Sequence, residues 1–346
     1  MRCPILASPI TLALALLLTG CAPPASRPPV LTADVTASGE TTAVATQDAD
    51  AADDPAIWRN AADPAASLIV GTDKKAGLYV YGLDGSVRDF INAGRVNNVD
   101  LAETPAGIIV VASDRNDNDN AHLALFRLDP VTARLTAIGR VPAGAGEAYG
   151  VCLFAAPYAL HAFIVLKDGT IRQIALDAAT GTGRTVRTMK LPSQSEGCVV
   201  DARTARLYAA EEDAGLWRFD ALPQGSTTPV RIASTDGARL VADAEGLAIA
   251  ATGAGNGGWL IASSQGDNAY AVWRLSDDRY MGRFRIAAGR YGATQETDGI
   301  EVKTGNFGPA FPAGIMIAQD GNNAPKAQNF KLVRWDAVQK TLKLPG

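Results

Sequence analysis

Acidic residues recur along the chain at nearly constant intervals, each in a turn directly before an apolar segment. The six turns are marked by Asp54, Asp100, Glu147, Glu196, Glu245 and Asp298. The intervals between successive markers are 46, 47, 49, 49 and 53 residues, a period typical of propeller blades. If each marker opens the innermost strand of a blade, all six acids reach one end of a central channel. A ring of carboxylates there predicts a metal site or a funnel for cations.

Basic residues occupy a second repeated position, one strand after the acidic turns of the first three repeats. Lys74 and Lys75, then Arg115, then Lys167 follow apolar segments of similar length. The later repeats carry Glu211-Glu212, Ser264-Gln265 and Gln319-Asp320 at this position. One side of the channel mouth is therefore expected to be cationic and the other anionic. Arg and Lys suit a phosphate group, which Arg can bind through two parallel hydrogen bonds. Each Lys taken alone also fits a solvated turn.

The acidic markers favour calcium among metal ions. Crowded carboxylates raise one another's pKa unless a cation neutralises them. Calcium accepts six to eight oxygen ligands, backbone carbonyls included. A merely solvated acidic rim is the alternative. The loop Asp114–Asn120 is rich in Asp and Asn, but it lacks the Gly and terminal Glu of an EF-hand, so we interpret it as a polar loop around Arg115.

Composition excludes several other classes of protein. The net charge is -4 and the pI is near 5.3, which argues against nucleic-acid binding. The two histidines, His122 and His161, are too few for a His-rich zinc or iron site. No nucleotide-binding glycine loop and no Gly-x-Ser-x-Gly motif is present.

The N-terminal segment has the features of an export signal. Residues 1–20 combine Arg2 with a short apolar stretch, too short to span a bilayer. Leu18-Thr19-Gly20-Cys21 resembles the lipobox of bacterial lipoproteins, which implies lipidation of Cys21 and membrane attachment. Ala22 favours the outer membrane in that class, and a plain secretory signal is the alternative. We expect residues 21–46 to form a flexible tether. In an oxidising compartment Cys152 and Cys198 could form a disulfide, or remain two buried thiols.

The repeats predict an all-β fold. After each acidic turn, an apolar strand, a polar turn and a second strand follow, as in Leu68–Val70 and Leu78–Tyr81. We therefore predict a six-bladed β-propeller, with four-stranded antiparallel blades around a central channel, over residues 47–346. Residues 43–45 are candidates for closing the ring against the last blade. A β-sandwich and a β-helix are the alternatives.

Several motifs resemble those of the β-propeller phytases, in order, from about residue 47 to 336. Residues 50–58 (DAADDPAIW) and 97–101 (NNVDL) are similar to two signature motifs of that family. Further similar motifs cover residues 72–78, 195–197, 210–213, 243–247, 262–266, 297–300, 318–321 and 328–331. One departure is Asp168 after Lys167, where the family has Glu.

The resemblance implies a calcium-dependent phosphomonoesterase, a 3-phytase, that hydrolyses phytate and other inositol phosphates by attack of a metal-held water. The implied calcium ligands are Asp53, Asp54, Glu196, Glu211, Glu245 and Asp298, the backbone oxygens of Pro55 and Val99, and the side chains of Asp243 and Gln265. The implied phosphate-binding residues are Lys74, Lys75, Arg115, Tyr149 and Lys167. The implied catalytic residues are Lys74, Arg115, Tyr149, Lys167, Glu196 and Asp298.

Two other functions remain open from the sequence. A calcium-dependent propeller hydrolase of the gluconolactonase type would use one central metal, but it leaves the basic residues unexplained. A surface lipoprotein that binds inositol phosphates without cleaving them would need the same residues. We expect a monomer whose contact with the membrane is through Cys21 only.

Overall fold

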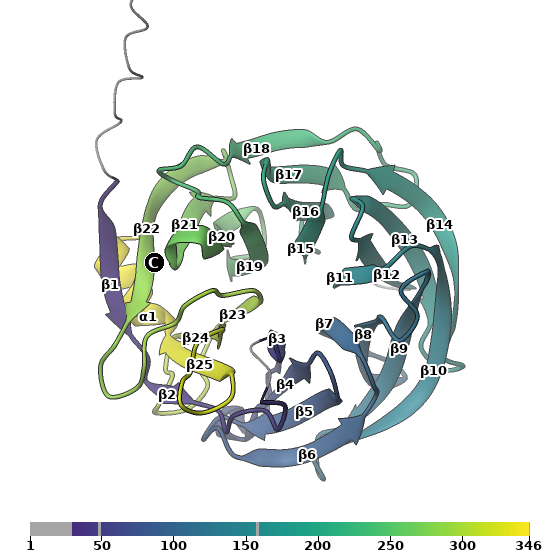
Figure 1. The fold of residues 1–346 in the computed structure, drawn as a ribbon, viewed down its shortest axis with the longest axis horizontal. Coiled ribbons are helices and arrows are strands. Elements are labelled where there is room, and N and C mark those ends of the chain that lie inside the picture. Colours follow the sequence, from purple (N-terminus) through teal and green to yellow (C-terminus); the bar gives the residue numbers. More distant parts are fainter. Residues whose placement is uncertain (1–29, 48–49, 157–158, 346) are drawn as a thin grey trace, which may run out of the picture.

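Six β-sheets surround a central channel in the computed structural model, which describes residues 30–47, 50–156 and 159–345 (Figure 1). Each sheet is one blade. Within a blade, successive strands run antiparallel from the channel outward. The predicted six-bladed propeller is confirmed.

The first three blades follow one another without interruption. Blade 1 contains β3 (Ala52–Trp58), β4 (Leu68–Asp73), β5 (Gly77–Gly82) and β6 (Val87–Asn92). Blade 2 contains β7 (Val96–Thr104), β8 (Gly107–Asp114), β9 (Asn120–Asp129) and β10 (Arg134–Ala145). Blade 3 contains β11 (Ala148–Ala156), β12 (Ala159–Leu166), β13 (Thr170–Asp177) and β14 (Thr182–Lys190).

Of the last three blades, blades 5 and 6 each include a strand from the N-terminal segment. Blade 4 contains β15 (Ser195–Asp201), β16 (Arg206–Glu211), β17 (Gly215–Asp220) and β18 (Val230–Ser234). Blade 5 contains β19 (Ala244–Thr252), β20 (Gly257–Ser264), β21 (Ala269–Arg274), β22 (Arg279–Ala287) and β1 (Thr32–Thr36). Blade 6 contains β23 (Ile300–Thr304), β24 (Gly314–Asp320), β25 (Asn329–Arg334) and β2 (Gly39–Glu40). Two short 3₁₀ turns (Pro64–Ala66, Gln265–Asp267) and helix α1 (Trp335–Leu342) complete the elements.

The N-terminal strands close the ring. β2 pairs antiparallel with β25, and β1 pairs parallel with β22 at the outer edge of blade 5. Backbone bonds from Thr41 to Phe330 and from Val44 to Gln328 extend the contact with blade 6, as proposed for residues 43–45. The prediction that residues 21–46 form a flexible tether is therefore wrong for the part from Thr32 onward, because that part pairs with the blades. Pairing the first and last strands in this way leaves fewer open sheet edges.

The hydrophobic core lies between neighbouring blades, in six clusters. The interface of blades 1 and 2, for example, joins Val70 and Val80 to Val99 and Val110. The second strand of a blade is covered on both faces, which explains its continuous apolar sequence. In contrast, β6 at the outer edge alternates between more and less exposed residues. Among the described residues, no helix is both long and apolar enough to cross a membrane.

A disulfide joins Cys152 in β11 to Cys198 in β15, with a Cα–Cα distance of 5.7 Å. The sequence was compatible with either a disulfide or two free thiols, and the structure contains the disulfide. It links the innermost strands of blades 3 and 4 near the end of the channel where the predicted site residues lie.

Candidate metal and phosphate site

Residues at the start of the inner strands, or in blade 6 just before it, meet at one end of the channel, called here the acid mouth. Its side chains come from Asp53, Asn97, Tyr149, Glu196, Glu245 and Asp298, one from each blade. In five of the six inner strands the pairing register shifts at this position, for example between Ser195 and Cys198. A β-bulge re-aims side chains near a strand end. The bulges therefore allow adjacent residues such as Asp53 and Asp54 to face the channel.

Three buried carboxylates form the centre of the anionic side. Glu196, Glu212 and Glu245 each offer one oxygen atom within 4.8 Å of the others. Among the described residues, no hydrogen-bond partner exists for Glu212 Oε1 or Glu245 Oε2. Buried polar atoms without a partner are rare in folded proteins. These oxygens are therefore positioned to accept a ligand that the protein itself does not provide.

The carboxylates perturb one another in the metal-free protein. Burial, followed by the charge of Asp53, raises the pKa of Glu196 well above its usual value. Burial, followed by the charge of Glu196, does the same for Glu245. The pKa of Asp298 rises to about 7, mainly through burial and against the attraction of Lys74. Raised values of this kind arise where like charges share a dry site.

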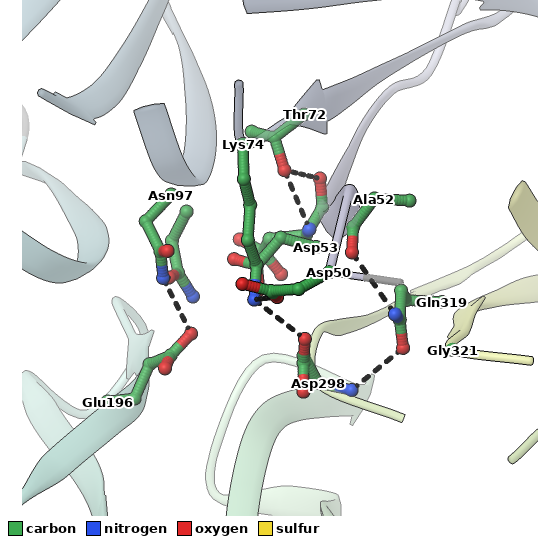
Figure 2. A network of polar contacts seen from close by, with 12 residues as sticks. Asp50, Ala52, Asp53, Thr72, Lys74, Asn97, Glu196, Asp298, Gln319 and Gly321 are labelled. Atoms are coloured by element: carbon green, nitrogen blue, oxygen red, sulfur yellow. Dashed lines mark hydrogen bonds and ion pairs between the residues drawn. The ribbon is translucent and has the colours of Figure 1, made fainter. Parts of the chain in front are cut away.

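Lys74 lies among carboxylates on the anionic side of the mouth (Figure 2). Its ammonium nitrogen lies 2.7 Å from Asp50, 2.8 Å from Asp53 and 2.9 Å from Asp298. Burial lowers the pKa of Lys74, but these charges raise it well above its usual value. Lys74 therefore remains an ammonium group and offsets part of the local negative charge.

Arg115, Tyr149 and Lys167 form the cationic side. The Arg115 guanidinium carbon and the Lys167 nitrogen lie 5.7 Å and 5.2 Å from the centre of the Tyr149 ring. Arg115 also donates hydrogen bonds to Asn97 and Glu147. The Tyr149 hydroxyl bonds Glu196, and burial together with the Glu196 charge raises its pKa far above the usual range. Tyr149 therefore keeps its proton and serves as a donor.

One backbone contact repeats in five blades and fixes which residue enters the mouth. The residue directly after the second strand donates its N–H to the carbonyl of the residue directly before the inner strand. The donors are Lys74, Arg115, Lys167, Glu212 and Gln265. The position that the sequence predicted to be basic is thus structurally equivalent in these five blades. In blade 4 it is occupied by Glu212.

The structure therefore argues against the prediction that Glu211 is a calcium ligand. The Glu211 carboxylate accepts hydrogen bonds from Ser193 and from the Trp217 indole. Adjacent residues of a strand face opposite sides, so Glu211 points away from the cluster that contains Glu212. An alignment of Glu212 with Lys74 and Lys167 would have identified it from the sequence.

Asp54 and Asp100 lie deeper in the channel than the sequence predicted. Asp54 accepts the N–H of Val99 at 3.0 Å, and the charges of Asp100 and Glu301 act on it. Asp100 accepts the N–H groups of Leu101 and Leu153. The marker Asp100 is thus not at the acid mouth, where blade 2 places Asn97 instead. Pro55 and Val99 directly follow the bulges of β3 and β7.

The remaining predicted residues lie at the rim. Gln265 donates a hydrogen bond to Asp298 at 2.5 Å. Asp243 accepts the backbone N–H of Gln265, and burial, followed by the charge of Asp213, raises its pKa. Lys75 lies 3.5 Å from Asp50. Asp168, which departs from the family motif, pairs with Lys190.

Sequence reasoning missed residues that hold the others in place. Asn97 donates to Glu196 at 2.9 Å and accepts from Arg115. The nitrogen of Asn98, when its amide faces these groups, lies 2.9 Å from Glu196 and 3.2 Å from Asp53. Both residues belong to the motif at residues 97–101, but the sequence does not show what an amide does at a position where the other repeats have an acid. A pattern of types cannot show which neighbours an amide bridges.

The donor set fits calcium. Carboxylates, an amide oxygen and backbone carbonyls are the hard oxygen ligands that calcium prefers. The unpartnered oxygens of Glu212 and Glu245 and the raised pKa values show a deficit of positive charge. No nitrogen or sulfur donor lies in this cluster of the described residues, which argues against a zinc site.

The fold and the site define a propeller whose channel mouth can hold cations beside a phosphate. A model of the phytase family matches residues 5–344, and the chain belongs to this family. It is 38% identical to the 3-phytase of Bacillus subtilis (strain 168) over 328 residues, covering 89% of this chain and 85% of the relative. A chain in the crystal structure of the mitotic checkpoint complex is 14% identical and matches 94% of this chain and 86% of its own length, with a TM-score of 0.52. That similarity concerns the propeller fold alone.

Proposed function

We propose that the protein hydrolyses phytate, myo-inositol hexakisphosphate, to lower inositol phosphates and orthophosphate in a calcium-dependent reaction. The observation that carries the proposal is one mouth that joins unpartnered carboxylates to three basic side chains and a tyrosine hydroxyl. Membership of the phytase family supports phytate as the substrate.

The residues divide into two groups by charge. Glu196, Glu212, Glu245 and Asp298 would hold calcium at the mouth, and Asp54 with the carbonyls of Pro55 and Val99 would hold a further ion deeper in the channel. Asp53, Asp243 and Gln265 complete the proposed ligands. Bound calcium neutralises the carboxylates and the substrate, and it lowers the pKa of water that it holds.

The cationic residues orient the phosphate group. Arg115 is restrained by Asn97 and Glu147, so its guanidinium loses little freedom when it binds a phosphate. Lys74 and Lys167 belong to blades 1 and 3, and the Tyr149 ring lies close to both Arg115 and Lys167. Lys75, which is partly exposed, is placed to contact a neighbouring phosphate of the same substrate. These contacts stabilise the negative charge that develops during phosphate transfer.

The direct test is release of orthophosphate from phytate by the purified protein. We expect activity with calcium, loss with excess EDTA, and recovery when calcium is restored. Tight phytate binding without release in calcium would instead support the inositol-phosphate-binding function. Hydrolysis of lactones but not of phytate would support the gluconolactonase type.

We also propose that the protein is exported and attached to a membrane, most simply the bacterial outer membrane, through lipidated Cys21. The signal segment 1–20 and Cys21 lie outside the described residues. The lipobox pattern supports the proposal, and so does the Cys152–Cys198 disulfide, because such bonds persist in oxidising compartments. Fractionation of cells should place the protein in membranes, and Cys21→Ser should release it. Light scattering of the released form should give the mass of a monomer.

A further inference from the structure

Four glycines lie at the acid mouth, each directly after a mouth residue and against the next blade. They are Gly150, Gly197, Gly246 and Gly299. None has a positive φ, so backbone conformation does not require glycine at these positions. Any residue could adopt these angles, and the reason for glycine must be space.

The space is taken by the carbonyl of the mouth acid in the following blade. A Cβ on Gly150 would lie 1.9 Å from the carbonyl oxygen of Glu196. On Gly197 it would lie 2.3 Å from that of Glu245, and on Gly246 2.4 Å from that of Asp298. On Gly299 it would lie 2.3 Å from a carboxylate oxygen of Asp54 and 2.6 Å from the carbonyl oxygen of Asp53. All these contacts are far inside van der Waals distance.

Two of these glycines also bind the carbonyl that they approach. The N–H of Gly246 donates to Asp298 at 2.9 Å, and the N–H of Gly299 donates to Asp53 at 3.0 Å. The contacts run in one direction around the ring, from blade 3 through blades 4, 5 and 6 to blade 1. Each glycine thus brings the backbone of one mouth residue against the backbone of the next mouth residue.

The other two junctions use side chains instead. Between blades 1 and 2, Asp54 accepts the N–H of Val99. Between blades 2 and 3, Ser113 donates to the carbonyl of Tyr149 at 2.6 Å. The junctions at Gly197, Gly246 and Gly299 each join two carboxylate residues, whose charges repel one another, and the junction at Gly150 joins Tyr149 to Glu196. The side-chain junctions coincide with the Arg115 and Tyr149 side.

We propose that Gly150, Gly197, Gly246 and Gly299 are positioning residues that set the spacing of the calcium-binding carboxylates. Repulsion between Glu196, Glu245 and Asp298 favours separation of blades 4, 5 and 6. Backbone packing at the glycines opposes that separation and keeps the carboxylate oxygens close enough to share cations. A methyl group at one junction widens it, and the acids on either side lose their common ligand. This inference rests on the proposed calcium dependence.

The test is calcium binding, measured by calorimetry on metal-free protein with Ca²⁺ alone. Gly246→Ala and Gly197→Ala act at two different junctions. Gly255→Ala is the matched control, because Gly255 also lacks a positive φ and a Cβ there meets nothing within 4 Å. We expect roughly tenfold or greater loss of calcium affinity in both junction variants, the range found for residues that orient metal ligands. The control should bind calcium as the unaltered protein does.

Thermal unfolding separates positioning from general stability. Without calcium, the junction variants should unfold at a lower temperature than the Gly255→Ala control, because the added methyl group meets a backbone carbonyl. Addition of calcium should raise the unfolding temperature of the junction variants by less than it raises that of the control. Unchanged affinity in the folded variants would overturn this inference alone, whereas no calcium binding by the unaltered protein would overturn it together with the metal assignment. If both variants failed to fold even in calcium, the glycines would belong to folding rather than to the site.

Discussion

The two ends of the channel treat their acidic residues differently. At the acid mouth, Glu212 and Glu245 each have a buried oxygen without a partner. At the opposite end, called here the far mouth, the inner strands line a cavity of about 580 Å³. There Arg203 binds both oxygens of Asp201, and the Trp58 indole donates to Glu103 at 2.7 Å.

The difference shows which acids serve a ligand. A carboxylate that is already satisfied by the protein gains little from a cation, and one that lacks partners gains a great deal. The same six strands produce both ends. Whether an acid serves a ligand therefore depends on the partners that the protein provides for it, and not on the number of acids at that end. The variants below alter single acids of the channel so that their effects can be compared.

Loss of the Asp298 charge should have the largest effect. Asp298 accepts from Gln265 and pairs with Lys74 at 2.9 Å, so it links a rim residue to a phosphate-binding one. We expect Asp298→Asn to lower phytate hydrolysis by roughly a hundredfold or more, as for other groups that stabilise charge in a transition state. The measurement is the initial rate of orthophosphate release at saturating calcium.

Asp201→Asn is its control at the far mouth. The change leaves Arg203 without its charged partner, at a cost of about 1–3 kcal/mol in stability. The rate of phytate hydrolysis per folded molecule should stay unchanged. Equal loss of activity in both variants would mean that the two ends are not functionally distinct.

The adjacent pair Glu211 and Glu212 gives a comparison within a single turn. Glu212→Gln should weaken calcium binding by about tenfold to a hundredfold, because its carboxylate belongs to the cluster with Glu196 and Glu245. Glu211→Gln should instead lower the unfolding temperature, because its carboxylate binds Ser193 and Trp217. Calorimetry with Ca²⁺ and thermal unfolding distinguish the two, and the reverse assignment would restore Glu211 as the ligand.

The pH dependence of stability should reveal the buried acids of the channel whose pKa is raised. In the folded metal-free protein, the pKa values of Asp298 and Glu301 are raised to about 7 and about 8, mainly by burial. As pH rises from about 4 toward these values, the unfolded chain releases protons that the folded protein retains, so stability falls. The free energy of unfolding without metal should therefore decrease between about pH 5 and about pH 8.

Glu301→Gln should reduce this decrease, because it removes one of the carboxyl groups whose pKa is raised. Calcium should reduce it as well, since the bound ion favours the ionised carboxylates of the folded protein. The measurement is denaturant unfolding across this pH range, with and without calcium. A stability that rises with pH in the metal-free protein would contradict the raised pKa values.

Much of this arrangement could be predicted from the sequence, since the period of the acidic turns and the hairpin pattern gave the propeller and the rim. The shortfalls have local causes. In blade 2 the mouth position holds an amide, Asn97, and the acid that served as its marker, Asp100, lies three residues further along β7, so a search for acids alone misplaces the position. The choice between Glu211 and Glu212 depends on a register of one residue. The pairing of β1 and β2 joins segments about 250 and 290 residues apart, which no local pattern shows.

The smallest effect should come from Glu103→Gln at the far mouth. Glu103 is exposed, and its one described contact is the bond from the Trp58 indole, which a Gln oxygen can also accept. We expect a change in stability below about 1 kcal/mol, with the same calcium affinity and the same rate of phytate hydrolysis. Calorimetry and the rate assay should be run beside Glu212→Gln, which makes the same chemical change at the acid mouth. A comparable loss of calcium affinity in the two variants would show that cations sense the net charge of the channel, and not the particular carboxylates that the protein leaves without partners.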